Sequence, residues 1–210
     1  MKYKNTSRLS RLLSREKIRR WLYTALITCM IGTIFPGCEK SEDDNPFPEE
    51  DPLEAYLSAA GFSSGDVTSQ MITEDTEAGL VFTPQVDGII NAIIVKIPNH
   101  KENLRVTLWD ADAKTVLLTT YIPMAHNDIE FIQDIAPFNV TKGVSYAITM
   151  NVTSYYQHLK SGNAPSYPIT AGNIVIDQSL RQVTSQQIFP ESDISNSYIG
   201  NISFVFRQTE

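Results

Sequence analysis

The sequence predicts an all-β protein, an antiparallel β-sandwich with one short N-terminal helix. From Val67 onward apolar and polar residues alternate with a period of two, as they do in strands with one buried face. Turn-forming residues interrupt these runs about every ten residues. After residue 62 no amphipathic stretch has the length of a helix, which disfavours a parallel sheet with crossover helices. A sandwich built from many short strands is therefore favoured.

The helix is predicted at residues 52–60. Asp51 suits the N-cap, Pro52 the first turn and Glu54 the capping-box position, and Gly61 ends the segment. The apolar residues recur at helical spacing, at Leu53, Tyr56, Leu57 and Ala60. We expect this stripe to pack on the sandwich.

The clearest strand is predicted at residues 144–152, where every second residue is apolar. The same alternation recurs at residues 104–108, 116–122, 129–135 and 202–206. Residues 88–98 are apolar on both faces, which is typical of a central strand. Residues 52–210 are thus expected to form one sandwich domain around a single core.

Residues 1–37 are predicted to be a secretory signal peptide. The first 20 residues hold eight basic residues and one acidic residue, and the 15 residues 21–35 carry no charge. As a helix the apolar run would span about 22 Å, short of the roughly 30 Å hydrocarbon core of a bilayer. A permanent transmembrane helix is therefore disfavoured.

Cys38 is the predicted lipidation site. Gly37 and Cys38 end the apolar run in a pattern that resembles the lipobox of bacterial lipoproteins, in which Cys38 would become the acylated first residue. Phe35 and Pro36 depart from that motif, which prefers an aliphatic and then a small residue. Cys29 lies within the apolar run and is interpreted as a signal residue. On this interpretation no cysteine is left for a disulfide or a thiolate metal site.

Residues 38–51 are predicted to be an acidic, proline-rich tether. The acidic cluster at 39–44 also resembles the surface-export signal of lipoproteins in one Gram-negative phylum, the alternative being a plain charged linker. We therefore expect an outer-membrane lipoprotein exposed on the cell surface. From Cys38 onward 9 basic residues face 23 acidic ones, so nucleic acid is not an expected partner.

Residues 79–88, 104–112 and 137–146 together resemble an extracellular β-sandwich family, domain of unknown function 4082. The resemblance covers roughly residues 70–157 and fails at 126–129, where members commonly carry a Gly-Trp pair. It implies a jelly-roll-like sandwich appended to secreted or surface proteins, often beside carbohydrate-active modules, with no established catalytic residues.

The candidate ligand-binding residues are aromatic. Tyr155, Tyr156 and Tyr167 flank the polar loop 161–166 and could stack on a sugar ring. The alternative is that these tyrosines cover the open end of the sandwich with their hydroxyls in water. Trp109 is a further candidate, because alternation points it outward, although a bulge would return it to the core.

No catalytic or cofactor site is predicted. Asp110 and Asp112 are weak Ca²⁺ candidates, since their segment lacks the glycine and distal carboxylate of an EF-hand, and a hairpin turn is the favoured interpretation. The three histidines, His100, His126 and His158, lie in or near predicted loops, match no catalytic motif and are expected at the surface. We expect neither a bound metal nor enzymatic activity.

These observations favour a binding module for a glycan or a partner protein, attached to the membrane through its lipid anchor. The alternative is a structural or assembly subunit, or an adhesin, that uses a sheet edge as its interface.

Overall fold

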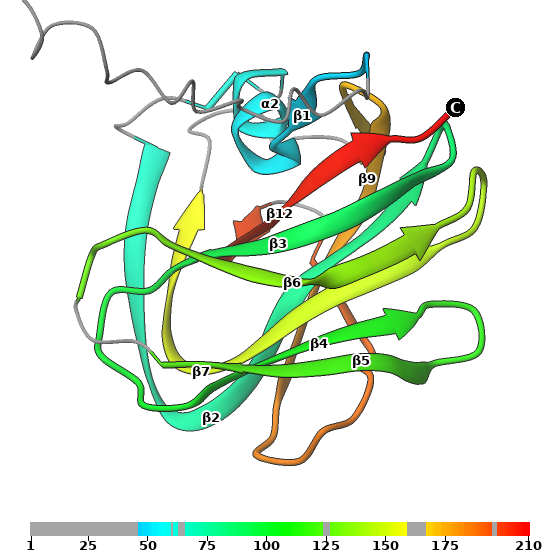
Figure 1. Ribbon diagram of the computed structural model, residues 1–210. Helices are drawn as coiled ribbons and strands as arrows, with labels where there is room; N and C mark the ends of the chain where they lie inside the picture. Colours follow the sequence, from blue (N-terminus) through cyan, green and yellow to red (C-terminus); the bar gives the residue numbers. More distant parts are fainter. Residues whose placement is uncertain (1–45, 60, 63–65, 124–126, 159–166, 195–196) are drawn as a thin grey trace, which may run out of the picture. The chain divides into compact units, whose positions relative to one another are not determined.

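The computed structural model describes residues 46–59, 61–62, 66–123, 127–158, 167–194 and 197–210. They form two antiparallel sheets packed face to face with one short helix, so the predicted sandwich is confirmed (Figure 1). In chain order the elements are β1 (Glu49–Glu50), α2 (Pro52–Ala59), β2 (Val67–Pro84), β3 (Gly88–Lys96), β4 (Leu104–Asp110), β5 (Thr115–Ile122), β6 (Phe131–Val140), β7 (Tyr146–His158), β8 (Ile169–Ala171), β9 (Ile174–Val183), β10 (Ser192–Ile194), β11 (Tyr198–Ile199) and β12 (Asn201–Gln208). None of the described residues belongs to a helix with the length and hydropathy of a membrane span.

The strands pair like one long hairpin rolled into two layers. β1 pairs with β12, β2 with β7, β3 with β6 and β4 with β5, so each antiparallel pair is nested inside the previous one. Successive pairs alternate between a four-stranded sheet, β1-β12-β3-β6, and an eight-stranded sheet that contains β2-β7-β4-β5. This arrangement is a jelly roll, as predicted. The segment β8 to β11 is inserted between β7 and β12, and it widens the eight-stranded sheet because β9 pairs with β2 and β10 with β9.

The core lies between the two sheets, where the period-two alternation directs the apolar side chains. Phe82 of β2 meets Phe204 of β12 with ring centroids 4.5 Å apart, and both are fully buried. Burial of such a side chain stabilises the fold by roughly 1.5–3 kcal/mol. Helix α2 adds Tyr56, whose ring lies 4.9 Å from that of Tyr198. The predicted N-cap is confirmed, since the Asp51 carboxylate accepts a hydrogen bond of 2.9 Å from the Leu53 backbone N–H.

The folded part begins before residue 52, where the predicted tether was expected to end. Glu49 and Glu50 form β1, opposite Arg207 and Phe206 of β12. The Glu50 carboxylate also accepts hydrogen bonds from the backbone N–H and the side-chain amide of Asn173, at 2.8 and 2.6 Å. These glutamates are therefore part of the sandwich, because their backbone and carboxylates find partners there. The predicted signal peptide, Cys38 and the acidic cluster lie outside the described residues.

Candidate functional site

The outer face of the eight-stranded sheet, which points away from the core, is crossed by residues 184–191. We call this connection from β9 to β10 the strap. Gln187 Nε2 donates hydrogen bonds to the hydroxyls of Thr107 on β4 and Thr119 on β5, at 3.0 and 2.6 Å. Phe189 meets the Trp109 ring edge-on at 5.8 Å. The strap is thus held by hydrogen bonds in its middle and by an aromatic contact near its end.

Beneath the end of the strap lies a second apolar cluster, formed by Val81, Trp109, Ala147 and Leu180 with Phe189 packed against it. Trp109 belongs to the outer face, because β4 keeps its regular pairing with β7 up to Asp110 and alternation directs Leu108 inward and Trp109 outward. Its ring is nevertheless only 2% exposed, and its indole N–H donates to the Thr149 hydroxyl at 2.8 Å. Trp109 therefore offers no free ring to a ligand, which corrects its assignment as a binding candidate: the strap covers it.

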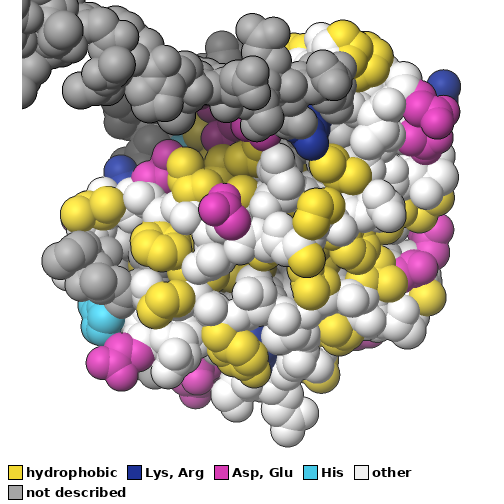
Figure 2. Space-filling view, viewed as in Figure 1, with side chains coloured by type: hydrophobic (Ala, Val, Ile, Leu, Met, Phe, Trp, Pro, Cys, Tyr) yellow, Lys and Arg dark blue, Asp and Glu magenta, His cyan; other side chains and the backbone are white. Residues whose placement is uncertain are grey.

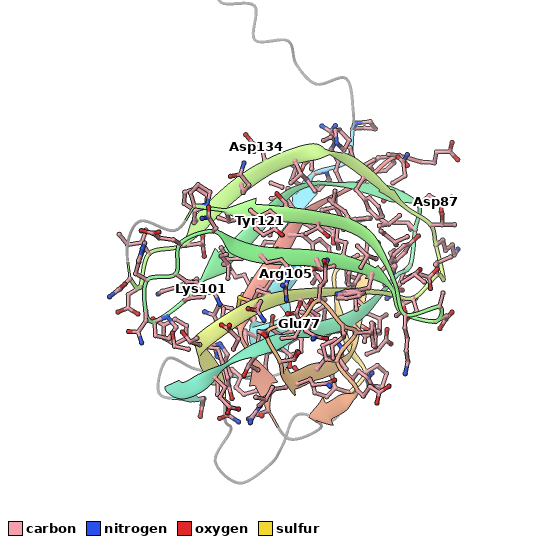
Figure 3. The ribbon with its side chains drawn as sticks, turned by 90° about the horizontal axis from the view of Figure 1, so that it is seen from below. Glu77, Asp87, Lys101, Arg105, Tyr121 and Asp134 are labelled. Carbon is pink, nitrogen blue, oxygen red and sulfur yellow. The ribbon has the colours of Figure 1, made fainter. Side chains whose placement is uncertain are left out.

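A buried ionic network lies on the same outer face, centred on Glu77 of β2 (Figure 3). Its carboxylate accepts hydrogen bonds from Arg105 Nη2 at 2.9 Å, from the Thr149 hydroxyl at 2.9 Å and from Asn151 Nδ2 at 3.1 Å. The Glu77 side chain has no exposed surface, so these partners replace the water that the charge has lost. Glu77 is therefore a structural centre of the face, closed to solvent.

The same network fixes the start of the strap. Arg105 Nη1 donates to the carbonyl of Ser185 at 3.2 Å, and Asn151 Nδ2 donates to the carbonyl of Thr184 at 2.9 Å. A second ion pair joins Lys101 Nζ to Asp75 Oδ1 at 2.6 Å, and Lys101 also reaches Asn151 Oδ1 at 3.1 Å. Both ends of the strap are thus supported by the sheet below, which gives it a defined position.

A pocket of about 240 Å³ opens beside the Phe189 end of the strap. We call it the Phe189 pocket. Val81, Leu180 and Phe189 give it apolar walls. Its polar and charged lining residues are Asp112, Lys114, Ser145, Gln178 and Glu191. The pocket therefore combines an apolar surface with groups that can donate and accept hydrogen bonds, as small-molecule sites do.

The hairpin turn between β4 and β5 supplies one side of the pocket. Asp110 Oδ1 accepts a hydrogen bond of 2.8 Å from the Ala113 backbone N–H, and Lys114 adopts a left-handed conformation with φ of 55°. The predicted turn is therefore observed, and Asp110 stabilises it. Lys114 Nζ lies 5.7 Å from the centre of the Phe189 ring and 3.5 Å from Glu191 Oε1. Among the residues with described positions, no group of three His, Cys, Asp or Glu side chains is placed to hold a metal ion.

The predicted tyrosine patch is not assembled at the surface. β7 runs on to His158, beyond the predicted strand end at residue 152. Its register with β2 shifts between Val152 and Ser154, which breaks the alternation, so Val152 and Tyr155 both face the core and Tyr155 is 1% exposed. The Tyr167 hydroxyl is engaged by Tyr56 and Ser179, at 2.8 and 3.0 Å. Tyr155 and Tyr167 therefore serve the fold, which corrects their assignment to ligand stacking.

The remaining tyrosine of that patch, Tyr156, is partly buried, and Lys96 Nζ lies 5.6 Å from its ring centre. The polar loop at 161–166, which the tyrosines were expected to flank, lies outside the described residues.

His158 is also buried, which corrects its predicted surface position. It ends β7 and is 2% exposed, with its ring edge-on to Phe62 and Tyr198. Its Nε2–H donates to Asn201 Oδ1 at 2.7 Å, whereas Nδ1 has no hydrogen-bond partner among the described residues. Burial lowers the pKa of His158 below its ordinary value of 6.5. His100 is exposed, and His126 lies outside the described residues.

We expect the protein to lose stability as the pH falls below 6.5, the ordinary pKa of histidine. There the unfolded chain takes up a proton on His158 that the folded chain, with its lowered pKa, does not. Above that pH both states are neutral and the contribution is complete. Urea unfolding across this range should give a smaller pH dependence for His158→Gln than for wild type, whereas exposed His100→Gln should behave like wild type. Identical pH profiles for all three proteins would contradict this assignment.

The comparisons with known proteins give no further assignment. No protein-family model matches the chain, and no curated protein matches it significantly. The resemblance to domain of unknown function 4082 therefore stays a prediction. The fold and site define the class of the protein: a jelly-roll sandwich with a strapped outer face and one small pocket beside the strap.

Proposed function

We propose that the protein is a lipid-anchored binding module on the bacterial cell surface, and that its sandwich binds a sugar unit in the Phe189 pocket. This proposal rests on the composition of the pocket. A pyranose has an apolar C–H face and a rim of hydroxyls, and the partly exposed side chains of Ala111 and Phe189 offer an apolar surface beside polar side chains. The protein acts by binding and carries out no chemical step.

The polar groups of the pocket support this assignment. The Gln178 amide can both donate and accept, the Ser145 hydroxyl can do the same, and the Asp112 carboxylate can accept from a sugar hydroxyl. Within the described part of the chain, the side chains of Gln178 and Ser145 make no hydrogen bond. The volume of 240 Å³ lies below the roughly 300–1,000 Å³ typical of drug-sized ligands, which favours a single ring.

The anchored strap favours affinity. Because Gln187 and Phe189 are held by the sheet, the pocket wall is formed before a ligand arrives. A preformed site loses less side-chain and loop freedom on binding than a site that must order itself. The acidic composition of the chain from Cys38 onward further favours an uncharged ligand over a polyanion.

A glycan array probed with the full chain in detergent tests the sugar-binding proposal. The glycan that gives the strongest signal should then bind Gln178→Ala about tenfold more weakly, because a buried hydrogen bond to the ligand is lost. Gln186→Ala, which changes an exposed glutamine of the strap, is the matched control and should keep wild-type affinity. A blank array, or equal affinity of both variants, would overturn the proposal.

The membrane anchor is supported by the basic start, the uncharged run at 21–35 and Cys38. Cells fed labelled palmitate should incorporate it into the wild-type chain and into Cys29→Ser, but not into Cys38→Ser. Acyl chains bind a bilayer with about 0.8 kcal/mol per buried CH₂ and contact no part of the core, so the sandwich should keep its unfolding midpoint. Undiminished labelling of Cys38→Ser would rule out this anchor.

A further inference from the structure

β5 is an edge strand whose pairing with β4 is interrupted by one bulge, at Leu117. It ends the path β10-β9-β2-β7-β4-β5 and, among the described strands, pairs with β4 alone. Its eight residues include no Lys, Arg, Asp, Glu or Pro. Those are the residues that commonly prevent an exposed sheet edge from pairing with another chain. β6, which ends the four-stranded sheet, carries Asp134 and Pro137 and is protected in this way.

β5 also exposes large apolar side chains. Val116, Leu117 and Tyr121 are 46, 42 and 60% exposed. The face of the molecule seen in Figure 2 carries many hydrophobic side chains and few charged ones. Tyr121 stands opposite Arg105 in the β4–β5 register, and Thr119 stands opposite Thr107 (Figure 3 labels Tyr121 and Arg105). Alternation places Thr119 and Tyr121 on the outer face of the sheet, and the bulge adds Leu117 next to Val116, which stands opposite Trp109 of that face.

We propose that β5 is a homodimer interface, at which it pairs antiparallel with β5 of a second copy and joins the two eight-stranded sheets into one. A two-fold axis perpendicular to the sheet places the outer faces of the two copies on the same side of the joined sheet. In this arrangement two residues that stand directly opposite each other across the interface lie on the same face of the joined sheet. The pairing of the two β5 strands can therefore shift only by an even number of residues. An axis through Thr119 places Leu117 of each copy opposite Tyr121 of the other.

The symmetry of the strand selects a second copy as the occupant. Leu117 and Tyr121 lie two residues on either side of Thr119, so one two-fold contact covers both exposed side chains in both copies. Aromatic and aliphatic residues opposite each other are favourable cross-strand pairs. The strand carries no charge, so two acidic copies meet through a neutral edge without placing like charges against each other.

Cysteine cross-linking tests this register. Thr119 should face its own counterpart across the axis, so Thr119→Cys in the full chain should form a disulfide-linked dimer under mild oxidation. Thr170→Cys on β8 is the matched control, since Thr170 is also an exposed strand threonine but lies away from β5. Equal cross-linking of the two variants, or no cross-linking of Thr119→Cys, would overturn the register.

Sedimentation equilibrium of the full chain in a density-matched detergent tests the dimer itself. We expect a dimer for wild type, a dimer dissociation constant raised about tenfold or more by Leu117→Lys, and wild-type behaviour of Val183→Lys, which places the same charge on an exposed apolar residue of β9. Unchanged thermal midpoints will show that both variants fold. A monomeric wild-type chain would overturn the proposal. The edge of β5 would then be a site at which a strand of another protein could pair.

Discussion

Replacing Gly79 with alanine is expected to lower the free energy of unfolding by about 3 kcal/mol or more. Gly79 lies in the middle of β2, opposite Thr149 of β7 and Leu180 of β9. A Cβ atom there would overlap the backbone carbonyl oxygen of Ile148 and lie 2.7 Å from Thr149 Cα. Backbone atoms of a paired strand cannot rotate away as a side chain can, so the β2–β7 pairing itself must shift. Urea unfolding followed by circular dichroism measures the loss.

Gly143→Ala is the control for this effect. Gly143 has a φ of +74°, and an added Cβ would meet nothing within 4 Å. Its replacement should therefore cost only the strain of a left-handed backbone, about 1–2 kcal/mol. If Gly79→Ala and Gly143→Ala lower the free energy of unfolding by the same amount, the close approach of β2 and β7 does not cause the loss and the prediction is wrong.

Glu77→Ala is expected to lower the free energy of unfolding by about 3–5 kcal/mol, because it leaves the largely buried guanidinium of Arg105 without its counter-charge. The substitution also removes the acceptor for Thr149 and Asn151. Chemical denaturation at neutral pH measures the change.

Two further variants separate the network from the mere loss of a carboxylate. Glu74→Ala changes an exposed glutamate of the same strand and should stay within about 0.5 kcal/mol of wild type. Arg105→Ala combined with Glu77→Ala should cost less than the sum of the single changes, since the second substitution removes a charge that the first left unpaired. Strict additivity would show that the two side chains contribute independently.

Local patterns were sufficient for the fold. The period-two alternation identifies β4, β5, β6, β7 and β12, and the run that is apolar on both faces corresponds to β3, which lies between β12 and β6. The capping residues around Asp51 identify α2. The insertion β8 to β11 was not predicted. β8, β10 and β11 are only two or three residues long, the ten residues of β9 do not alternate strictly, and the strap between β9 and β10 has no periodic pattern.

The site was harder to predict, because it depends on register and on distant pairing. The strap buries Trp109 on the outer face, and a register shift between β2 and β7 turns Tyr155 into the core; neither is marked in the composition. Gln178 and Ser145 meet in the pocket only because the inserted β9 pairs with β2. Glu77 gave no such signal, because it directly follows the polar residues Glu74, Asp75 and Thr76. Lipidation at Cys38 and the surface location stay predictions.

The place of β12 has a consequence for the order in which the protein can fold during synthesis. β12 lies between β1 and β3, so the four-stranded sheet lacks an inner strand until residues 201–208 have emerged. Ile202, Phe204 and Phe206 are fully buried, so the core between the two sheets lacks these side chains until β12 has paired. The nested pairing thus makes the last strand the one that completes the core, and long-range contacts of this kind form slowly. A chain of this topology therefore leaves its core incomplete until its last strand has been made.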